Sequence, residues 1–136
     1  MVCGTTACLA LLAFAGCQKG PYSCMKVSGK VTYEDGSLIP AERIRLVFVS
    51  QRPPIDPKIA PRNGTAEVDV KTGVFNSVTT YVKGDGIIEG EHKVVVQCLR
   101  GGLIAPDLAA DEFSDLARTP LKVRANDSPF VLKVHK

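Results

Sequence analysis

The densest group of side chains that could hold a metal ion or move a proton lies between residues 85 and 92. It consists of Asp85, Glu89, Glu91 and His92. Calcium prefers carboxylate ligands, but it takes about six to eight oxygens and these acids do not have EF-hand spacing. The whole chain has two histidines, which excludes a three-histidine zinc site. We therefore predict no metal site, and we interpret the acids as solvated loop residues and His92 as a structural residue at a strand end.

A second acidic stretch places Asp107, Asp111, Glu112 and Asp115 close together in the chain. Two carboxylates in different environments can act as acid and base on a sugar, but acids on a surface loop more often keep that loop soluble. No serine has the surroundings of a nucleophile elbow, and the glycine-rich residues 84–90 lack the lysine of a phosphate loop. We predict a protein that is not an enzyme and that needs no cofactor.

The overall charge does not point to nucleic acid. The formal net charge is +3, and the apolar and charged fractions of 45% and 23% are ordinary for a globular protein. Basic residues such as Arg43, Arg45, Lys58 and Arg62 are interleaved with valine, isoleucine and proline instead of forming one cluster. Because nucleic-acid surfaces need clustered lysine and arginine, we predict no nucleic-acid partner.

An apolar run occupies residues 7–15 and ends abruptly at Gly16 and Cys17. Its length fits the apolar region of a signal peptide, which has about 7 to 15 residues. It is shorter than the roughly 20 residues that span a bilayer. A buried helix of the fold is the alternative, but the run has no polar face. The pattern predicts an N-terminal signal peptide helix.

Phe14, Ala15, Gly16 and Cys17 resemble the lipobox of bacterial lipoproteins, with Phe14 in the place where leucine is commonest. The resemblance implies that cleavage removes residues 1–16 and that the Cys17 thiol carries diacylglycerol. Two or three acyl chains give stable anchoring, because each buried methylene contributes about 0.8 kcal/mol. Gln18 favours the outer membrane of the cell envelope, on its periplasmic or surface face. Secretion with simple cleavage and an uncleaved anchor are the alternatives.

The remaining cysteines then form an even pair. Cys3 and Cys8 leave with the leader and Cys17 is acylated, so Cys24 and Cys98 remain in an oxidising compartment. We predict a disulfide between them, which would stabilise the fold by on the order of 4 kcal/mol. The alternative is two unpaired thiols, with Cys98 buried at a strand end.

A short tether, residues 17–25, precedes a β domain over residues 26–136. Alternation of apolar and polar residues predicts about seven strands, at 27–33, 43–50, 66–70, 74–81, 92–97, 121–125 and 130–134. We expect 66–70 and 74–81 to form a hairpin. Residues 51–64 carry four prolines and must be a loop. One short helix is predicted at 108–116, inside the long segment 101–119.

Seven short strands are typical of a β-sandwich. The stretches VSGKVTYEDGSLIPAERIRLVF, KTGVF, GIIEGEHKVVV, TPLKV and SPFVLKV resemble a carboxypeptidase-regulatory-like, transthyretin-like domain. Such domains occur in small lipoproteins of planctomycete-type bacteria. The resemblance covers residues 26–135. It implies an all-β, antiparallel, Ig-like or transthyretin-like sandwich without catalytic residues.

The expected function is that of a noncatalytic cell-envelope lipoprotein. Its β-sandwich would act as a structural or protein-interaction module, attached to the membrane through the lipid and bound to an envelope protein. Loops 51–64 and 101–119 are the expected contact surfaces, because long loops carry function on such scaffolds. The alternative is a module that binds a glycan or another polymer. The chain has no tryptophan and only Tyr22, Tyr33 and Tyr81 as tyrosines, so it is poor in aromatic platforms for sugars.

Overall fold

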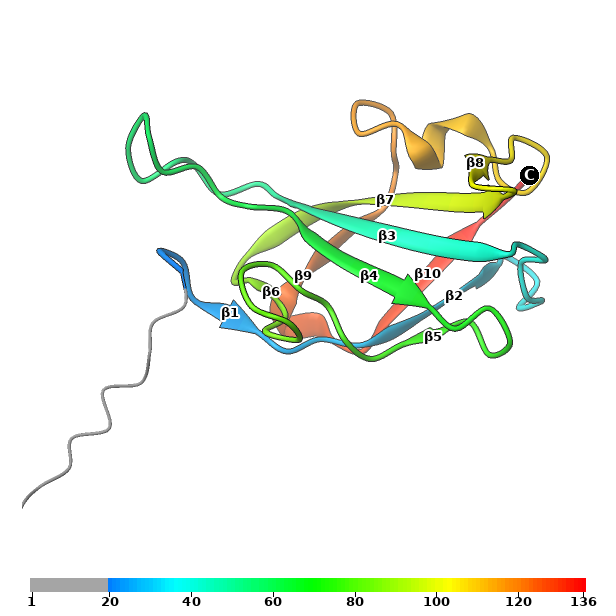
Figure 1. The fold of residues 1–136 in the computed structure, drawn as a ribbon, viewed down its shortest axis with the longest axis horizontal. Helices are drawn as coiled ribbons and strands as arrows, with labels where there is room; N and C mark the ends of the chain where they lie inside the picture. Colours follow the sequence, from blue (N-terminus) through cyan, green and yellow to red (C-terminus); the bar gives the residue numbers. More distant parts are fainter. Residues whose placement is uncertain (1–19) are drawn as a thin grey trace, which may run out of the picture.

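The computed structural model describes residues 20–136 as an all-β fold (Figure 1). The strands are β1 Cys24–Met25, β2 Gly29–Tyr33, β3 Arg43–Ser50, β4 Gly64–Val68, β5 Val74–Phe75, β6 Ile87–Ile88, β7 Glu91–Arg100, β8 Leu103–Ile104, β9 Lys122–Arg124 and β10 Phe130–Val134. Two 3₁₀ helices, η1 Asp111–Ser114 and η2 Ala125–Asp127, complete them. The predicted all-β class is confirmed, but about seven strands was too few. β1, β6 and β8 were missed because two residues cannot show an alternating pattern.

The largest sheet has the order β4-β3-β7-β8. The short strand β8 pairs with the last two residues of β7, and β9 pairs with the first three residues of β7. All its pairs are antiparallel, and β3 faces β7 from Arg43 opposite Leu99 to Ser50 opposite His92. β3 has the bounds that its sequence predicts. Its even-numbered residues from Ile44 to Phe48 are buried, and alternation of this kind fits a strand with one face on the core.

The second sheet corrects the expectation that every strand pair is antiparallel. Its order is β10-β2-β5, and β10 runs parallel to β2, with Phe130 opposite Gly29. Alternation of apolar and polar residues shows which face of a strand is buried, but it does not show whether the strand runs parallel or antiparallel to its neighbour. The predicted hairpin is present only in part: Thr65 and Thr79 form one antiparallel bridge and the Asp69 N–H donates to the Val74 carbonyl at 2.9 Å, but β5 itself pairs with β2. The chain changes sheets at the turn where Gly73 N–H donates to the Asp69 carbonyl at 2.6 Å.

The domain begins earlier than the predicted boundary at residue 26. β1 pairs with β6, placing Cys24 opposite Ile88, so this part of the expected tether belongs to the fold. Gly86 packs against the same segment, and a Cβ atom there would lie only 1.7 Å from the Met25 carbonyl oxygen. The predicted leader, residues 1–16, and Cys17 lie outside the described residues.

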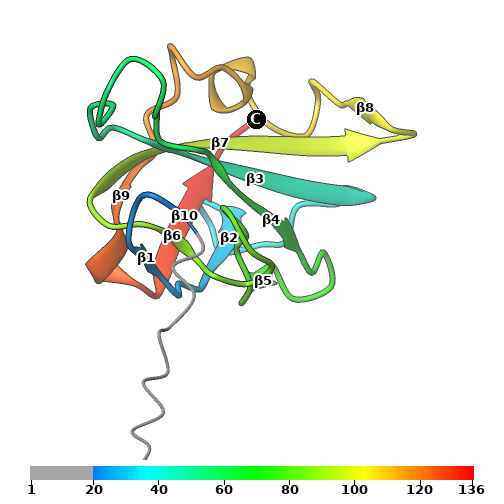
Figure 2. The same ribbon diagram turned by 60° about the vertical axis from the view of Figure 1, so that its left-hand side comes forward.

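The core lies between the two larger sheets, which Figure 2 shows as separate layers, with β3 and β7 in one and β2, β5 and β10 in the other. Phe48 of β3 packs its ring against two rings from the facing layer. The ring centroids lie 5.9 Å from Phe75 and 6.1 Å from Phe130. Burial of such large apolar side chains is the main source of stability in a domain of this size.

The predicted helix at 108–116 is reduced to the four residues of η1, of which only Phe113 is buried. At the start of η1, Ala110 gives no side-chain cap, and at its end the backbone of Asp115 is already extended. Among residues 20–136, no helix has the length and apolar character needed to cross a membrane.

The molecule has two ends, defined by the direction of β3 and β7. The Tyr22 end comprises Tyr22, the loop 51–63 and the start of β7 at Glu91. The β8 end comprises Arg43, the end of β7 at Arg100 and β8. The C-terminus lies near η1, where the Ala110 N–H donates to the His135 carbonyl at 2.8 Å. The two loops that the sequence marks as contact surfaces therefore leave β3 and β7 at opposite ends.

Candidate functional site

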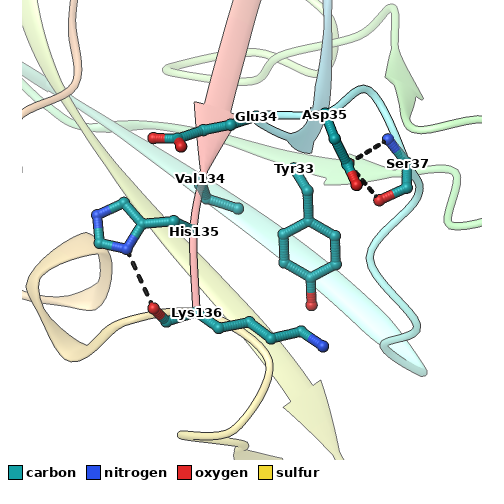
Figure 3. Close-up of a pocket in the computed structure, with 7 residues that line it drawn as sticks. All are labelled: Tyr33, Glu34, Asp35, Ser37, Val134, His135 and Lys136. Carbon is teal, nitrogen blue, oxygen red and sulfur yellow. Dashed lines mark hydrogen bonds between the residues drawn. The ribbon is translucent and has the colours of Figure 1, made fainter.

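A pocket of about 370 Å³ opens at the β8 end, where β2 and β10 finish side by side. Figure 3 shows the residues that line it, namely Tyr33, Glu34, Asp35, Ser37, Val134, His135 and Lys136. They belong to the ends of two parallel strands and to the turn after β2. The pairing of β10 with β2 thus brings residues 33–37 to residues 134–136.

The polar groups of this pocket are used for local structure. The Tyr33 hydroxyl donates to the Leu108 carbonyl at 2.7 Å, and the Lys136 ammonium lies 5.4 Å from the centre of the Tyr33 ring. The Asp35 carboxylate accepts hydrogen bonds from the hydroxyl and the backbone N–H of Ser37, and these bonds lower the pKa of Asp35. These contacts shape the turn and leave no activated nucleophile.

His135 is held by acceptors at both ring nitrogens. Its Nδ1 lies 3.1 Å from the Lys136 carbonyl oxygen and its Nε2 lies 2.9 Å from a Glu112 carboxylate oxygen. The Lys136 carbonyl first, and then Glu112, raise the pKa of His135 above its ordinary value. The Phe113 ring stands edge-on to the imidazole at 5.0 Å. This arrangement favours a charged imidazole that ties η1 to the end of β10 and makes a poor general base.

At the same end of the molecule, β8 forms the tip of a hairpin with β7. Gly101 and Gly102 have φ values of +61° and +79°, a left-handed conformation that side chains with a Cβ seldom adopt. Leu103 and Ile104 follow, with exposed fractions of 75% and 48%. Among the described strands, β8 is an edge strand, because it is the last in the sheet and pairs only with β7. An edge strand offers unpaired backbone groups to another chain, so this apolar edge could accept a partner.

Charged residues surround the apolar tip. Arg100 and Asp107 form an ion pair at 3.1 Å, and the Glu42 carboxylate accepts the Gly101 N–H at 2.9 Å. Exposed ion pairs contribute little to stability. An apolar centre with a charged rim is the usual organisation of a protein interface.

The metal candidates of residues 85–92 do not form a ligand set. The Asp85 carboxylate accepts backbone N–H groups of Thr80, Tyr81 and Val82 at 2.8, 3.0 and 3.0 Å. Burial alone would raise the pKa of Asp85, but these bonds together lower it. Glu89 is exposed. Within residues 20–136, no cluster of three or more His, Cys, Asp or Glu residues could hold a metal ion.

His92 is fully buried at the start of β7, as a structural histidine would be. Its Nε2 lies 2.6 Å from the Ile88 carbonyl oxygen, while its Nδ1 has no hydrogen-bond partner. Burial lowers the pKa of His92 and so favours the neutral ring. The imidazole lies edge-on to Phe48 of the core and is closed off from any substrate.

The predicted disulfide is wrong for this fold, because Cys24 and Cys98 are free thiols. Cys24 lies opposite Ile88, near the start of β7, whereas Cys98 lies near its end, opposite Ile44. From His92, whose ring contacts Ile88, to Cys98 the strand advances about 20 Å. A disulfide requires Cα atoms within about 7 Å.

The acids of residues 107–115 separate in the same way. Asp107 pairs with Arg100, and Asp115 pairs with Arg118 at 2.8 Å. Glu112, as described above, contacts His135. Three of the four carboxylates thus contact a basic partner of their own, and the fourth, Asp111, lies at the start of η1. No hydrogen bond joins any two of the four side chains, so their arrangement does not favour the acid–base pair of a glycosidase.

The three tyrosines are also occupied. The Tyr22 hydroxyl accepts the Ile55 N–H at 3.1 Å and lies 3.2 Å from the Ile59 carbonyl oxygen, within the loop 51–63. Arg62 stacks over the Tyr81 ring at 5.2 Å from its centre. Tyr33, at the pocket, lies against Lys136. None of the three stands free as a platform for a sugar ring, so no contact favours the polymer-binding alternative.

Sequence reasoning missed Tyr22, which it assigned to the tether, and did not single out Leu103 and Ile104 within segment 101–119. The adjacent pair Gly101–Gly102 was a usable signal for a tight hairpin, since paired glycines mark turns. Nothing local to Tyr22 shows that its hydroxyl reaches a loop 31 or more residues away. When the chain is compared with known proteins, no family model, no curated protein and no solved structure matches it.

Proposed function

We propose that this chain is a lipid-anchored protein of the bacterial cell envelope whose noncatalytic β domain works by contact with another envelope protein. The lipobox-like residues 14–17 support the anchor. The strand and turn patterns of residues 26–135 support a transthyretin-like sandwich of the carboxypeptidase-regulatory-like type. The local use of the acids, histidines and tyrosines fits a domain without chemistry of its own.

One observation carries the contact role: Leu103 and Ile104 are exposed side by side on an edge strand with a charged rim. Exposing two large apolar residues at a strand edge is a liability for an isolated domain, because it invites pairing with other chains. A partner that covers the edge would bury the apolar pair and satisfy the backbone groups of β8.

The anchor and this edge would lie at opposite ends. Gly20 is three residues from Cys17, a distance of at most about 11 Å. The Tyr22 end would therefore face the membrane. β7 has 10 residues and advances about 33 Å from Glu91 towards β8. The β8 edge would thus stand clear of the lipid, where another protein can reach it.

Two measurements on protein from its native membrane test the proposal. The intact mass should correspond to a chain that starts at Cys17 and carries acyl groups. A photo-reactive amino acid at Leu103 should then cross-link to an envelope protein when irradiated in cells. The matched control is the same amino acid at Val131, which is 72% exposed on β10 in the other sheet.

The lipid anchor and the contact surface can be refuted separately. A mass without acyl groups, or a chain that retains residues 1–16, would refute the anchor. An adduct that forms equally at Leu103 and Val131, or at neither, would refute the contact surface. Acylation together with an adduct confined to Leu103 supports both.

A further inference from the structure

The loop 51–63 projects from the Tyr22 end, beyond the strands β3 and β4 that it connects (Figure 1). Its residues are exposed except for Ile59 and Pro61, which are half-buried. The candidate site at the β8 end does not use it. A long exposed loop with four prolines is stiff, because each proline fixes its own backbone angle.

Hydrogen bonds hold the tip of this loop in one shape. The Ile55 N–H donates to the Ile59 carbonyl at 2.9 Å, closing a turn over residues 55–59. Inside the turn, the Asp56 carboxylate accepts the N–H groups of Lys58 and Ile59 at 2.6 and 3.0 Å. The Tyr22 hydroxyl joins the same turn at Ile55. The tip therefore has a fixed position relative to the segment that leads back to Cys17.

The tip combines an apolar residue with positive charge. Ile55 is 57% exposed. The same loop carries three basic residues, Arg52, Lys58 and Arg62, against the single acid Asp56, whose carboxylate accepts hydrogen bonds within the turn. None of the ion pairs found among residues 20–136 involves these three basic residues. The Arg52 Nε–H donates to the Glu89 carbonyl at 2.8 Å and Arg62 lies over the Tyr81 ring, but neither contact neutralises the positive charge. An apolar side chain in a loop of net positive charge suits the surface of an anionic membrane.

We propose that the tip of the loop 51–63 rests on the anionic lipid surface that carries the anchor, an inference that depends on the lipid anchor of the proposed function. Tyr22 is five residues from Cys17, which limits their separation to about 18 Å. The tip is thereby kept near the headgroups. Ile55 enters the headgroup boundary, and the basic side chains lie among the phosphates. The domain then has two attachments and a fixed orientation.

Tryptophan fluorescence can test this contact, because the chain has no tryptophan of its own. The acylated Ile55→Trp protein, purified from its membrane, is placed in vesicles of phosphatidylglycerol and phosphatidylcholine with brominated acyl chains. Its emission should shift to shorter wavelength and be quenched by bromine. Leu103→Trp, the matched control at the β8 end, should show neither change. Both positions are exposed, so neither change should disturb folding.

Charge provides a second, independent readout. Each basic residue near an anionic surface strengthens binding by about fivefold. Lys58→Gln in the Ile55→Trp background should therefore lower the ratio of engaged to free loop, measured by quenching, by about that factor. Lys71→Gln, which removes an exposed lysine from the turn at the β8 end, should leave the ratio unchanged. Vesicles of phosphatidylcholine alone should abolish the difference between the two variants.

The outcomes separate this inference from the proposed function. Acylated protein that floats with vesicles, but shows no quenching at position 55, overturns the lipid contact and leaves the anchor intact. The inference is also overturned if the loop is shielded from solvent in native membranes but not in pure lipid vesicles, because a protein would then cover the loop. Protein that lacks acyl groups and does not float overturns both.

Discussion

The two histidines of the chain lie in opposite surroundings and should titrate on opposite sides of the ordinary value of 6.5. Burial disfavours the charged form of His92 and lowers its pKa. The Lys136 carbonyl, assisted by Glu112, raises the pKa of His135. We expect a proton NMR titration to resolve two imidazole signals, with His135 retaining its proton to higher pH. The reverse order would contradict the burial of His92.

This difference also affects stability. Because the folded pKa of His92 is below its unfolded value, the unfolded chain binds the extra proton between those two values. The stability gained from neutral His92 is complete above about pH 6.5 and is lost as the pH falls towards the folded pKa. His135 has the opposite effect on stability, because its folded pKa is raised, so it is removed by the change His135→Asn. In that background, the free energy of unfolding measured in urea should be lower at about pH 5.5 than at about pH 7.5.

Gly86 is required by its backbone geometry. Its φ is +96°, and a Cβ atom would lie 1.7 Å from the Met25 carbonyl oxygen. Gly86→Ala should lower the free energy of unfolding by about 3 kcal/mol or more, since backbone must move to accept the methyl group. Gly36→Ala is the control, because Gly36 has a φ of +87° and no atom within 4 Å of that position. Equal losses for the two variants would show that the left-handed conformation alone matters.

The free thiols should react slowly in the folded protein. Burial raises the pKa of Cys24 and of Cys98 to about 11. At pH 8 only about one thiolate in a thousand is then present, and the thiolate is the reactive form. We expect slow alkylation of the native protein, fast alkylation of both thiols in urea without reductant, and no mass change on reduction. A gain of about two mass units on reduction would restore the disulfide that the sequence predicted.

At the scale of elements, the Tyr22 hydroxyl fastens the loop 51–63 to the domain. Tyr22→Phe should make opening of this loop easier by about 1 kcal/mol, or about fivefold, because the hydroxyl no longer accepts the Ile55 N–H. Limited trypsin digestion should report this as faster cleavage after Lys58. Tyr33→Phe, which loses a comparable hydrogen bond at the other end, should leave the rate of that cleavage unchanged.

Whether an element could be predicted from the sequence depended on its length and on the direction of its strand partner. β3 and β10 were found because each is long enough for alternation to be visible, and loop 51–64 because proline cannot donate to a strand ladder. The two-residue strands β1, β6 and β8 were not found, and the parallel direction of β10 could not be, since both depend on which distant segment lies alongside. The disulfide prediction failed for the same reason: counting cysteines says nothing of their separation.

The candidate site was predicted only at the level of loops. Sequence reasoning chose segments 51–64 and 101–119 from their length and composition, but it could not place them at opposite ends of β3 and β7. The exposure of Leu103 depends on β8 being the edge of its sheet, which is a property of strand order. The role of Tyr22 depends on a contact across 33 residues.

At the scale of the whole molecule, β10 closes the fold. Phe130, Leu132 and Val134 enter the core from it, and its parallel ladder covers β2 from Gly29 to Tyr33. Deleting residues 129–136 should leave the chain unfolded, because it removes three core side chains and one side of β2 at once. Circular dichroism and amide hydrogen exchange would show this directly. Removing only Lys136, which lies outside β10, should preserve the fold.

The pairing of Gly29 with Phe130 also determines when the second sheet can be completed during synthesis of the chain. At about 5 to 20 residues per second, β2 leaves the ribosome about 5 to 20 seconds before the strand that completes its sheet. During that interval the three-stranded sheet lacks its outer strand, and the core lacks the side chains that β10 supplies. For the envelope location that we propose, this delay would leave time for the chain to be exported before it can fold.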